Sequence, residues 1–208
     1  IFRGFLGGKV ENYASYVFIG VLVWGWFQTS LAQSTSLITS SRALLRQPRF
    51  PLSLLPLVTV AVRLFHFSLA LPILVALLWM QGIRPTSAWL GLPLLIAIQF
   101  ALITAFALPL AALNVRVRDT QHFVGVTLQL AMYLTPVFYN IDSLPARLGR
   151  WLEINPVVPL LEGWRSILLR GEWPDPGRLG ILACASAVLL VLGHRIFVHQ
   201  SRRFVEEL

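Results

Sequence analysis

The chain alternates between long apolar runs and short polar segments, a pattern typical of a membrane protein with several spans. A helix needs about 20 largely apolar residues to cross the hydrocarbon core of a bilayer. Five runs meet that requirement, at 13–35, 60–80, 90–113, 123–140 and 178–198. Because every backbone polar group must be satisfied inside a membrane, we expect these runs to be helices. The predicted fold is all-α, with a single transmembrane helical bundle over residues 1–208.

The segment 141–172 fits neither a span nor an ordinary loop, because it combines many charges with much Leu, Val and Trp. Apolar residues at helical spacing predict two short amphipathic helices there, at 143–153 and 157–170, with Glu162 and Ser166 on the polar side of the second. Asn155-Pro156 separates them, since proline disfavours a continuous helix. We expect an outer hairpin before the last span, either lying in the interface or re-entering the membrane.

Composition supports the membrane interpretation. The chain is 56% hydrophobic and only 12% charged, which exceeds the apolar fraction of a soluble domain. Its 17 basic and 9 acidic residues give a net charge of +8. The basic residues are scattered between apolar runs, which favours contact with lipid headgroups and excludes a nucleic-acid interface. Arginines in the 36–50 and 114–122 loops predict that both loops are cytoplasmic, which places 141–172 outside and the C-terminus inside.

Residues 12–118 contain no Asp or Glu, and buried acids are what proton-coupled carriers and intramembrane enzymes use. No metal site is expected, because His66, His194 and His199 lack companion ligands at suitable spacing. Cys184 is the only cysteine, and we expect it to be a packed, inert thiol. The sequence also lacks a GxxxxGK[ST] phosphate loop, so energy from ATP would have to enter through another chain.

Several motifs, in this order, resemble the permease subunit of type-2 ABC exporters, in the branch for O-antigen, capsular polysaccharide or teichoic acid. They are LNVRVRDTQHFV at 113–124, LTPVFY at 134–139, INP at 154–156 and Arg165. Upstream, YASYVFIGVLVWGWF and then LLRQPRFP are similar to that family's second span and the cytoplasmic loop after it.

The resemblance implies a multi-pass protein of the cytoplasmic membrane that is a transport subunit and not an enzyme. It implies a homodimer of six-span permeases, so that one N-terminal segment and span would precede the five visible here. A separate ABC ATPase subunit would carry ATP and Mg, with no cofactor in this chain. The cargo would be a polysaccharide, such as a lipid-linked O-antigen, moving between the two permease copies.

Aromatic and amide side chains on two predicted spans are candidates for the conduit, because flat rings suit sugar rings and amides bind hydroxyls. The first span carries an aromatic stripe, and the 123–140 run carries a polar face. The candidates are Tyr16, Trp24, Phe27, Gln129, Tyr133 and Tyr139. Aromatic residues at helical spacing also pack bundles, and the sequence leaves both roles open.

The cytoplasmic loop 36–51 is the predicted contact with the ATPase. Its basic residues would match an acidic or carbonyl-lined cleft, and its leucines would supply apolar contact. The predicted coupling residues are Arg42, Leu44, Leu45, Arg46 and Arg49.

Six residues are candidates for a gate or hinge, because prolines fix bends and few hinge residues suffice for switching. They are Arg118, Asp119, Pro136, Asn155, Pro156 and Arg165. Arg118-Asp119 either forms a local ion pair or marks a hinge near the entrance for the lipid-linked substrate. Arg165 is expected beside Glu162, with 141–172 as the outer gate.

Two other functions fit the composition. One is a drug or small-lipid exporter of the same superfamily. The other is a membrane-embedded enzyme acting on a lipid-linked sugar, for which Asp142, Glu153 and Glu162 would be the only candidate acids near an interface. Those acids alternate with arginines, which is more typical of a solvated face.

Overall fold

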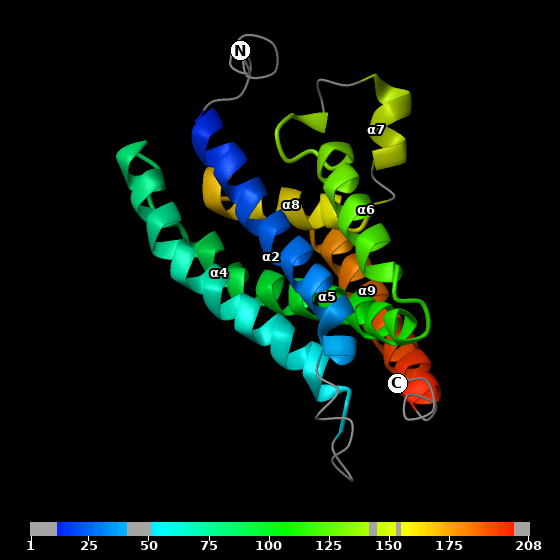
Figure 1. The fold of residues 1–208 in the computed structure, drawn as a ribbon. Coiled ribbons are helices and arrows are strands. Elements are labelled where there is room, and N and C mark those ends of the chain that lie inside the picture. The colour runs from blue at the N-terminus through cyan, green and yellow to red at the C-terminus, as the bar shows by residue number, and fades with distance from the viewer. Residues whose placement is uncertain (1–11, 41–50, 142–144, 153–154, 202–208) are drawn as a thin grey trace. The chain divides into compact units, whose positions relative to one another are not determined.

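The computed structural model describes residues 12–40, 51–141, 145–152 and 155–201, and these ranges form helices joined by turns (Figure 1). The long helices are α2 (Tyr13–Ser40), α4 (Leu54–Met80), α5 (Leu92–Arg116) and α9 (Pro176–Ser201). The shorter ones are α6 (Thr120–Leu134), α7 (Ala146–Leu152) and α8 (Val157–Arg165), with a 3-10 turn η1 (Ser87–Gly91) and a π-turn η3 (Ser166–Arg170). No strand occurs in these ranges, so the predicted all-α class is confirmed.

Four helices are long and apolar enough to cross a membrane: α2, α4, α9 and the continuous η1–α5 element from Ser87 to Arg116. They match four of the five predicted spans. The run 123–140 differs, because α6 has 15 residues and is therefore only about 22 Å long. Its helix ends before Thr135-Pro136, where proline cannot continue the backbone ladder. The predicted span there was too long.

The helix α4 begins six residues before its predicted start at 60. Arg63 therefore lies within the helix and not at its end. Its Nε donates a hydrogen bond of 2.8 Å to Oε1 of Gln33 on α2. This pairing gives the arginine a partner within the protein.

The chain forms two compact units. Unit 1 comprises 1–25, 67–97 and 129–182, and unit 2 comprises 26–66, 98–128 and 183–208. In unit 1, Trp164 of α8 packs edge-on against Phe67, with ring centroids 5.4 Å apart. Unit 2 has its own apolar core from α2, α5 and α9, formed by Ile38, Leu108, Ala111, Ala112, Val115 and Phe197.

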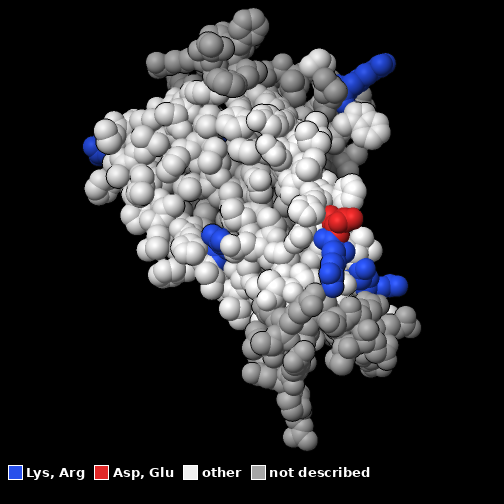
Figure 2. Space-filling model, in the orientation of Figure 1, with Lys and Arg blue, Asp and Glu red and all other residues white. Residues whose placement is uncertain are grey.

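Exposed apolar side chains cover the outward faces of the spans, as expected where lipid is the solvent. On α4, Phe65, Leu69 and Ile73 are each about 60% exposed. Figure 2 shows one face of the molecule, where uncharged residues predominate and charged side chains are few. Cys184 on α9 is also exposed, so the expectation of a packed thiol was wrong.

The segment after α6 contains the two predicted short helices, α7 and α8, on either side of Asn155-Pro156. The second helix, α8, exposes little polar surface to solvent. Most of α8 and η3 is buried in unit 1, including Ser166, which was expected on an exposed polar face. The reason is that the charged side chains of Glu162 and Arg165 find partners inside the protein.

Candidate functional site

A buried arginine is the centre of a polar cluster in unit 1. Arg165, the last residue of α8, is 0% exposed. Its guanidinium carbon lies 3.5 Å from the centroid of the Tyr16 ring on α2. Its Nη2 donates a hydrogen bond of 3.0 Å to the carbonyl oxygen of Val137, and its Nη1 donates one of 3.3 Å to Oε1 of Glu162. One side chain thus joins α2, the turn after α6, and α8.

The charge of Arg165 is tolerated because several groups offset its desolvation. Burial lowers the pKa of the guanidinium, whereas Tyr16 and Glu162 raise it. An arginine keeps its proton under these conditions, since its ordinary pKa is far above neutral. Glu162 remains partly exposed and also lies 3.6 Å from Nη2 of Arg170. Nε of Arg165 has no hydrogen-bond partner among the described residues.

The turn 135–139 is held by hydrogen bonds from two sides, α2 and the residue Asn155 just before α8. Tyr13 and Tyr16 on α2 donate their hydroxyls to the carbonyls of Phe138 (3.0 Å) and Tyr139 (2.9 Å). Asn155 donates its Nδ2 to Oγ1 of Thr135 at 3.0 Å. Its Oδ1 accepts the backbone N–H of Val157 at 3.0 Å, which satisfies one free donor at the start of α8. The turn after α6 is therefore fixed to both α2 and α8.

Gly20 allows Arg165 and the turn 135–139 to lie close to the backbone of α2. A Cβ atom at Gly20 would lie 3.0 Å from both Nη2 of Arg165 and the carbonyl oxygen of Val137. Those contacts are closer than almost all real Cβ contacts, so a side chain here would displace the arginine or the turn. The sequence signal was weak, because Gly20 reads as one small residue in an aromatic stripe.

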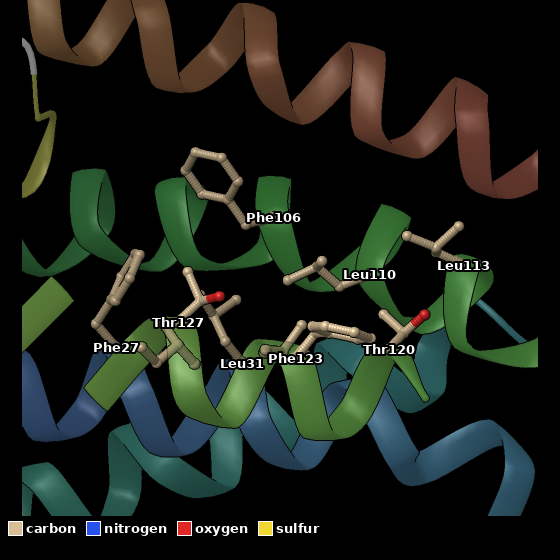
Figure 3. Close-up of a pocket in the computed structure, with 10 residues that line it drawn as sticks. Phe27, Leu31, Phe106, Leu110, Leu113, Thr120, Phe123 and Thr127 are labelled. Atoms are coloured by element: carbon tan, nitrogen blue, oxygen red, sulfur yellow. The ribbon is translucent and has the colours of Figure 1, made fainter. Parts of the chain in front are cut away.

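A second site, an apolar pocket of about 530 Å³, lies wholly in unit 2. Helices α2, α5 and α6 line it, and Figure 3 shows side chains from all three. The lining residues are Phe27, Leu31, Phe106, Leu110, Leu113, Thr120, Phe123, Val124, Thr127 and Leu128. Only the two threonines bring polar side chains to it.

Residues 2–169 match the ABC-2 type transporter family. The chain belongs to the ABC-2 type transporter family. It is 34% identical over 202 residues to the O-antigen export system permease protein RfbA of Myxococcus xanthus, covering 96% of this chain and 78% of the relative. It is 27% identical over 207 residues to a protein of the same description from Klebsiella pneumoniae, covering 99% and 80%.

Within this ABC-2 permease, four of the six predicted gate or hinge residues gather at the polar cluster: Pro136, Asn155, Pro156 and Arg165. The other two, Arg118 and Asp119, lie in unit 2 on the turn between α5 and α6, and both are exposed. No ion pair joins these two described residues, so the local ion pair considered for them is absent. Thr135 and the carbonyl of Val137 were not predicted, and the resemblance of LTPVFY was their only signal.

The predicted conduit residues of the permease do not form one surface. Tyr16, Trp24 and Phe27 are 6%, 2% and 6% exposed, which favours packing roles within one chain. Gln129 and Tyr133 are exposed on α6. A conduit between two copies needs side chains on the surface of each copy, so these two stay the better candidates. Tyr139 is half-buried, and its hydroxyl donates to the carbonyl of Leu134 at the end of α6 at 3.1 Å.

The predicted coupling residues lie outside the described part of the permease. They are Arg42, Leu44, Leu45, Arg46 and Arg49, and the flanking helices α2 and α4 end and begin at Ser40 and Leu54.

Proposed function

We propose that this permease is the membrane-spanning subunit of an ABC exporter that moves a polysaccharide of the O-antigen type across the cytoplasmic membrane. The observation that carries the proposal is the similarity to O-antigen export permeases over almost the whole chain. Four long apolar helices fit a multi-pass protein of that membrane. The absence of acidic residues from 12–118 agrees with transport driven from another subunit.

The proposed assembly has two copies of the permease and a separate ABC ATPase that binds ATP and Mg. The lack of a phosphate-loop motif in this sequence supports the proposal that ATP binds to a separate subunit. The loop 36–51 is the proposed contact with the ATPase, because its three arginines, with Leu44 and Leu45, offer both charge and apolar surface.

The proposed path for the glycan has its walls on α6, where Gln129 and Tyr133 are exposed. The proposed gate is the segment 141–172. Its attachment to α2 through Arg165 and to the turn 135–139 through Asn155 supports this, because movement of α2 would reach the segment directly. A lipid-linked form of the glycan is part of the same proposal.

The deciding experiment is export in a bacterial host that lacks its own O-antigen permease but keeps the glycan and the matching ATPase. We expect this permease, in its full-length form, to restore polysaccharide at the cell surface. Restored drug resistance without surface polysaccharide would instead favour the small-molecule exporter. No restoration of either, with the permease inserted and the ATPase bound, would contradict the proposal.

The contact with the ATPase is tested separately by replacing Leu44 and Leu45 with Asp. We expect the ATPase to be lost when the permease is purified, because two charges would enter an apolar contact. Ser87→Asp, at an exposed serine outside the loop 36–51, is the matched control and should leave the complex intact. An intact complex with both leucines replaced would place the contact elsewhere.

A further inference from the structure

A buried amide side chain joins the ends of three helices in unit 2. Asn114, near the end of α5, is 1% exposed. Its Nδ2 donates a hydrogen bond of 3.2 Å to Oγ1 of Thr39, near the end of α2. Its Oδ1 accepts the backbone N–H of Gln121, in the first turn of α6, at 3.0 Å. All three residues belong to unit 2, and we call these two hydrogen bonds the Asn114 clamp.

The chemistry of the partners allows one arrangement of donors and acceptors in the clamp. A backbone N–H can only donate, so the amide oxygen of Asn114 faces Gln121 and its Nδ2 faces Thr39. The Thr39 hydroxyl gives its own proton to the carbonyl oxygen of Ser36 at 2.8 Å, and its oxygen therefore accepts from Asn114. Loss of that oxygen would leave a buried N–H group without this partner, which is costly.

The joint between α2 and α5 beside the clamp is apolar and closely packed. Ile38, which precedes Thr39, is fully buried in a core that includes Ala111 and Val115 of α5. Packed cores do not deform gradually, so the ends of α2 and α5 are expected to move together. The clamp extends this joint to α6, because the N–H of Gln121 is one of the first donors of a helix, which have no partner within it.

The two sides of the clamp lead to different parts of the proposed transport machinery. Helix α2 ends at Ser40, and the predicted ATPase contacts, from Arg42 to Arg49, follow in sequence. Gln121 begins the helix that carries Gln129 and Tyr133, the proposed wall of the glycan path. Because backbone hydrogen bonds hold each helix as one element, a displacement at the end of α2 would reach α6 through Asn114.

We propose that Asn114 is a positioning residue of the transport cycle, which transmits ATP-driven movement from the end of α2 to α6. It acts through Thr39 and Gln121 and not by contact with ATP or cargo. The proposal rests on the separate ATPase of the proposed function, whatever cargo the permease exports. Without the clamp, ATP hydrolysis would continue but α6 would no longer follow it.

The test follows the movement of α6 with a fluorescent label. Val126 is 60% exposed on α6, so Val126→Cys can carry a bimane group once Cys184, which is also exposed, is replaced by Ser. The full-length permease is assembled with its ATPase in nanodiscs. The change in fluorescence on adding ATP and the rate of ATP hydrolysis are then measured on the same sample. We expect ATP to change the fluorescence when the clamp is intact.

Thr39→Val replaces the accepting hydroxyl by a methyl group. It should reduce the fluorescence change about fivefold, a typical effect of removing one contact that couples two sites, while ATP hydrolysis continues. Thr39→Ser keeps the hydroxyl and should preserve the full change. Thr35→Val is the matched control on the same helix, because the Thr35 hydroxyl donates to the carbonyl oxygen of Leu31 within α2 at 2.7 Å. It should also preserve the full change.

Asn114→Ala removes both hydrogen bonds and should reduce the fluorescence change at least as much as Thr39→Val. If this variant does not assemble, the comparison of Thr39→Val with Thr39→Ser still decides. Equal effects of Thr39→Val and Thr35→Val would overturn the proposal, as would a parallel loss of ATP hydrolysis and fluorescence change in Thr39→Val. A label that does not respond while the unaltered complex hydrolyses ATP would also overturn it. Failure of the permease to bind any ABC ATPase would contradict the proposed function and the clamp with it.

Discussion

Units 1 and 2 differ in their net charge and in the pairing of their charged residues. Unit 1 holds eight basic and six acidic residues, a net charge of +2. Among its described residues, three arginines pair with acids within 4.0 Å. Unit 2 holds nine basic and three acidic residues, which is an excess that its own acids cannot balance. The pocket in unit 2 is apolar.

The difference in charge pairing indicates that charged side chains have different roles in the two units. In unit 1, charge is used internally, and buried Arg165 fixes a turn against two helices. In unit 2, the described residues Arg118 and Arg195 are exposed, where an anionic leaflet or an acidic partner would compensate their charge. Substitutions that disturb internal charge should therefore affect stability most, and those that alter exposed side chains should affect function with little cost in stability.

The largest effect is expected from Arg165→Met, which keeps an unbranched apolar stem but removes the guanidinium and its charge. The Val137 carbonyl would lose its partner, at a cost of about 1–3 kcal/mol, and a desolvated cation–π contact of about 2 kcal/mol would be lost. We expect the free energy of unfolding in detergent to fall by about 3 kcal/mol. The measurement is denaturant unfolding followed by tryptophan fluorescence.

Arg170→Gln is the matched control for that substitution. Its side chain is 51% exposed and shares Glu162 with Arg165, so its removal should change stability by less than about 0.5 kcal/mol. Equal losses for the two variants would mean that burial of Arg165 does not set its contribution, and the contrast between internal and outward charge would fail.

The contacts of Arg165 show which features could be predicted from the sequence and which could not. Helical spacing of Glu162 and Arg165 predicted their proximity, and the structure confirms it. Hydropathy predicted four spans, because lipid imposes a strong and local constraint. The burial of Arg165 against Tyr16 was not predictable, because it depends on contacts between segments far apart in sequence. The same limit explains why Tyr16 was grouped with exposed Tyr133 as one conduit surface.

Gly193→Ala tests close packing in unit 2, where no buried charge is involved. A Cβ at Gly193 on α9 would meet the carbonyl oxygen of Ala105 on α5 at less than any real contact distance. The two helices would have to separate, and we expect a loss of about 2–3 kcal/mol. Gly180→Ala on the same helix has nothing within 4 Å and should be neutral or slightly stabilising. A neutral Gly193→Ala would show that this contact can relax.

Gly20→Ala tests the geometry of the cluster in unit 1 without removing any charge. The added methyl would lie 3.0 Å from Nη2 of Arg165, which can shift, and from the carbonyl oxygen of Val137. Because part of the clash can relax, we expect a loss of only about 1–2 kcal/mol. Gly25→Ala on the same helix has open space and should gain up to about 1 kcal/mol. The measurement is thermal unfolding of the two variants side by side. A more stable Gly20→Ala or a less stable Gly25→Ala would contradict the prediction.

The smallest change in stability is expected from Tyr133→Ala, and it separates exposed from buried aromatic residues. Tyr133 is 65% exposed on α6, so its loss should change the free energy of unfolding by less than about 0.5 kcal/mol. If its ring lines the glycan path, the rate at which polysaccharide reaches the cell surface should still fall. The neighbouring Leu134, 64% exposed, offers a control of similar exposure without a polar edge. Equal export rates for Tyr133→Ala and Leu134→Ala would remove Tyr133 from the conduit, because an aromatic ring that binds sugar must contribute more than an exposed aliphatic side chain beside it.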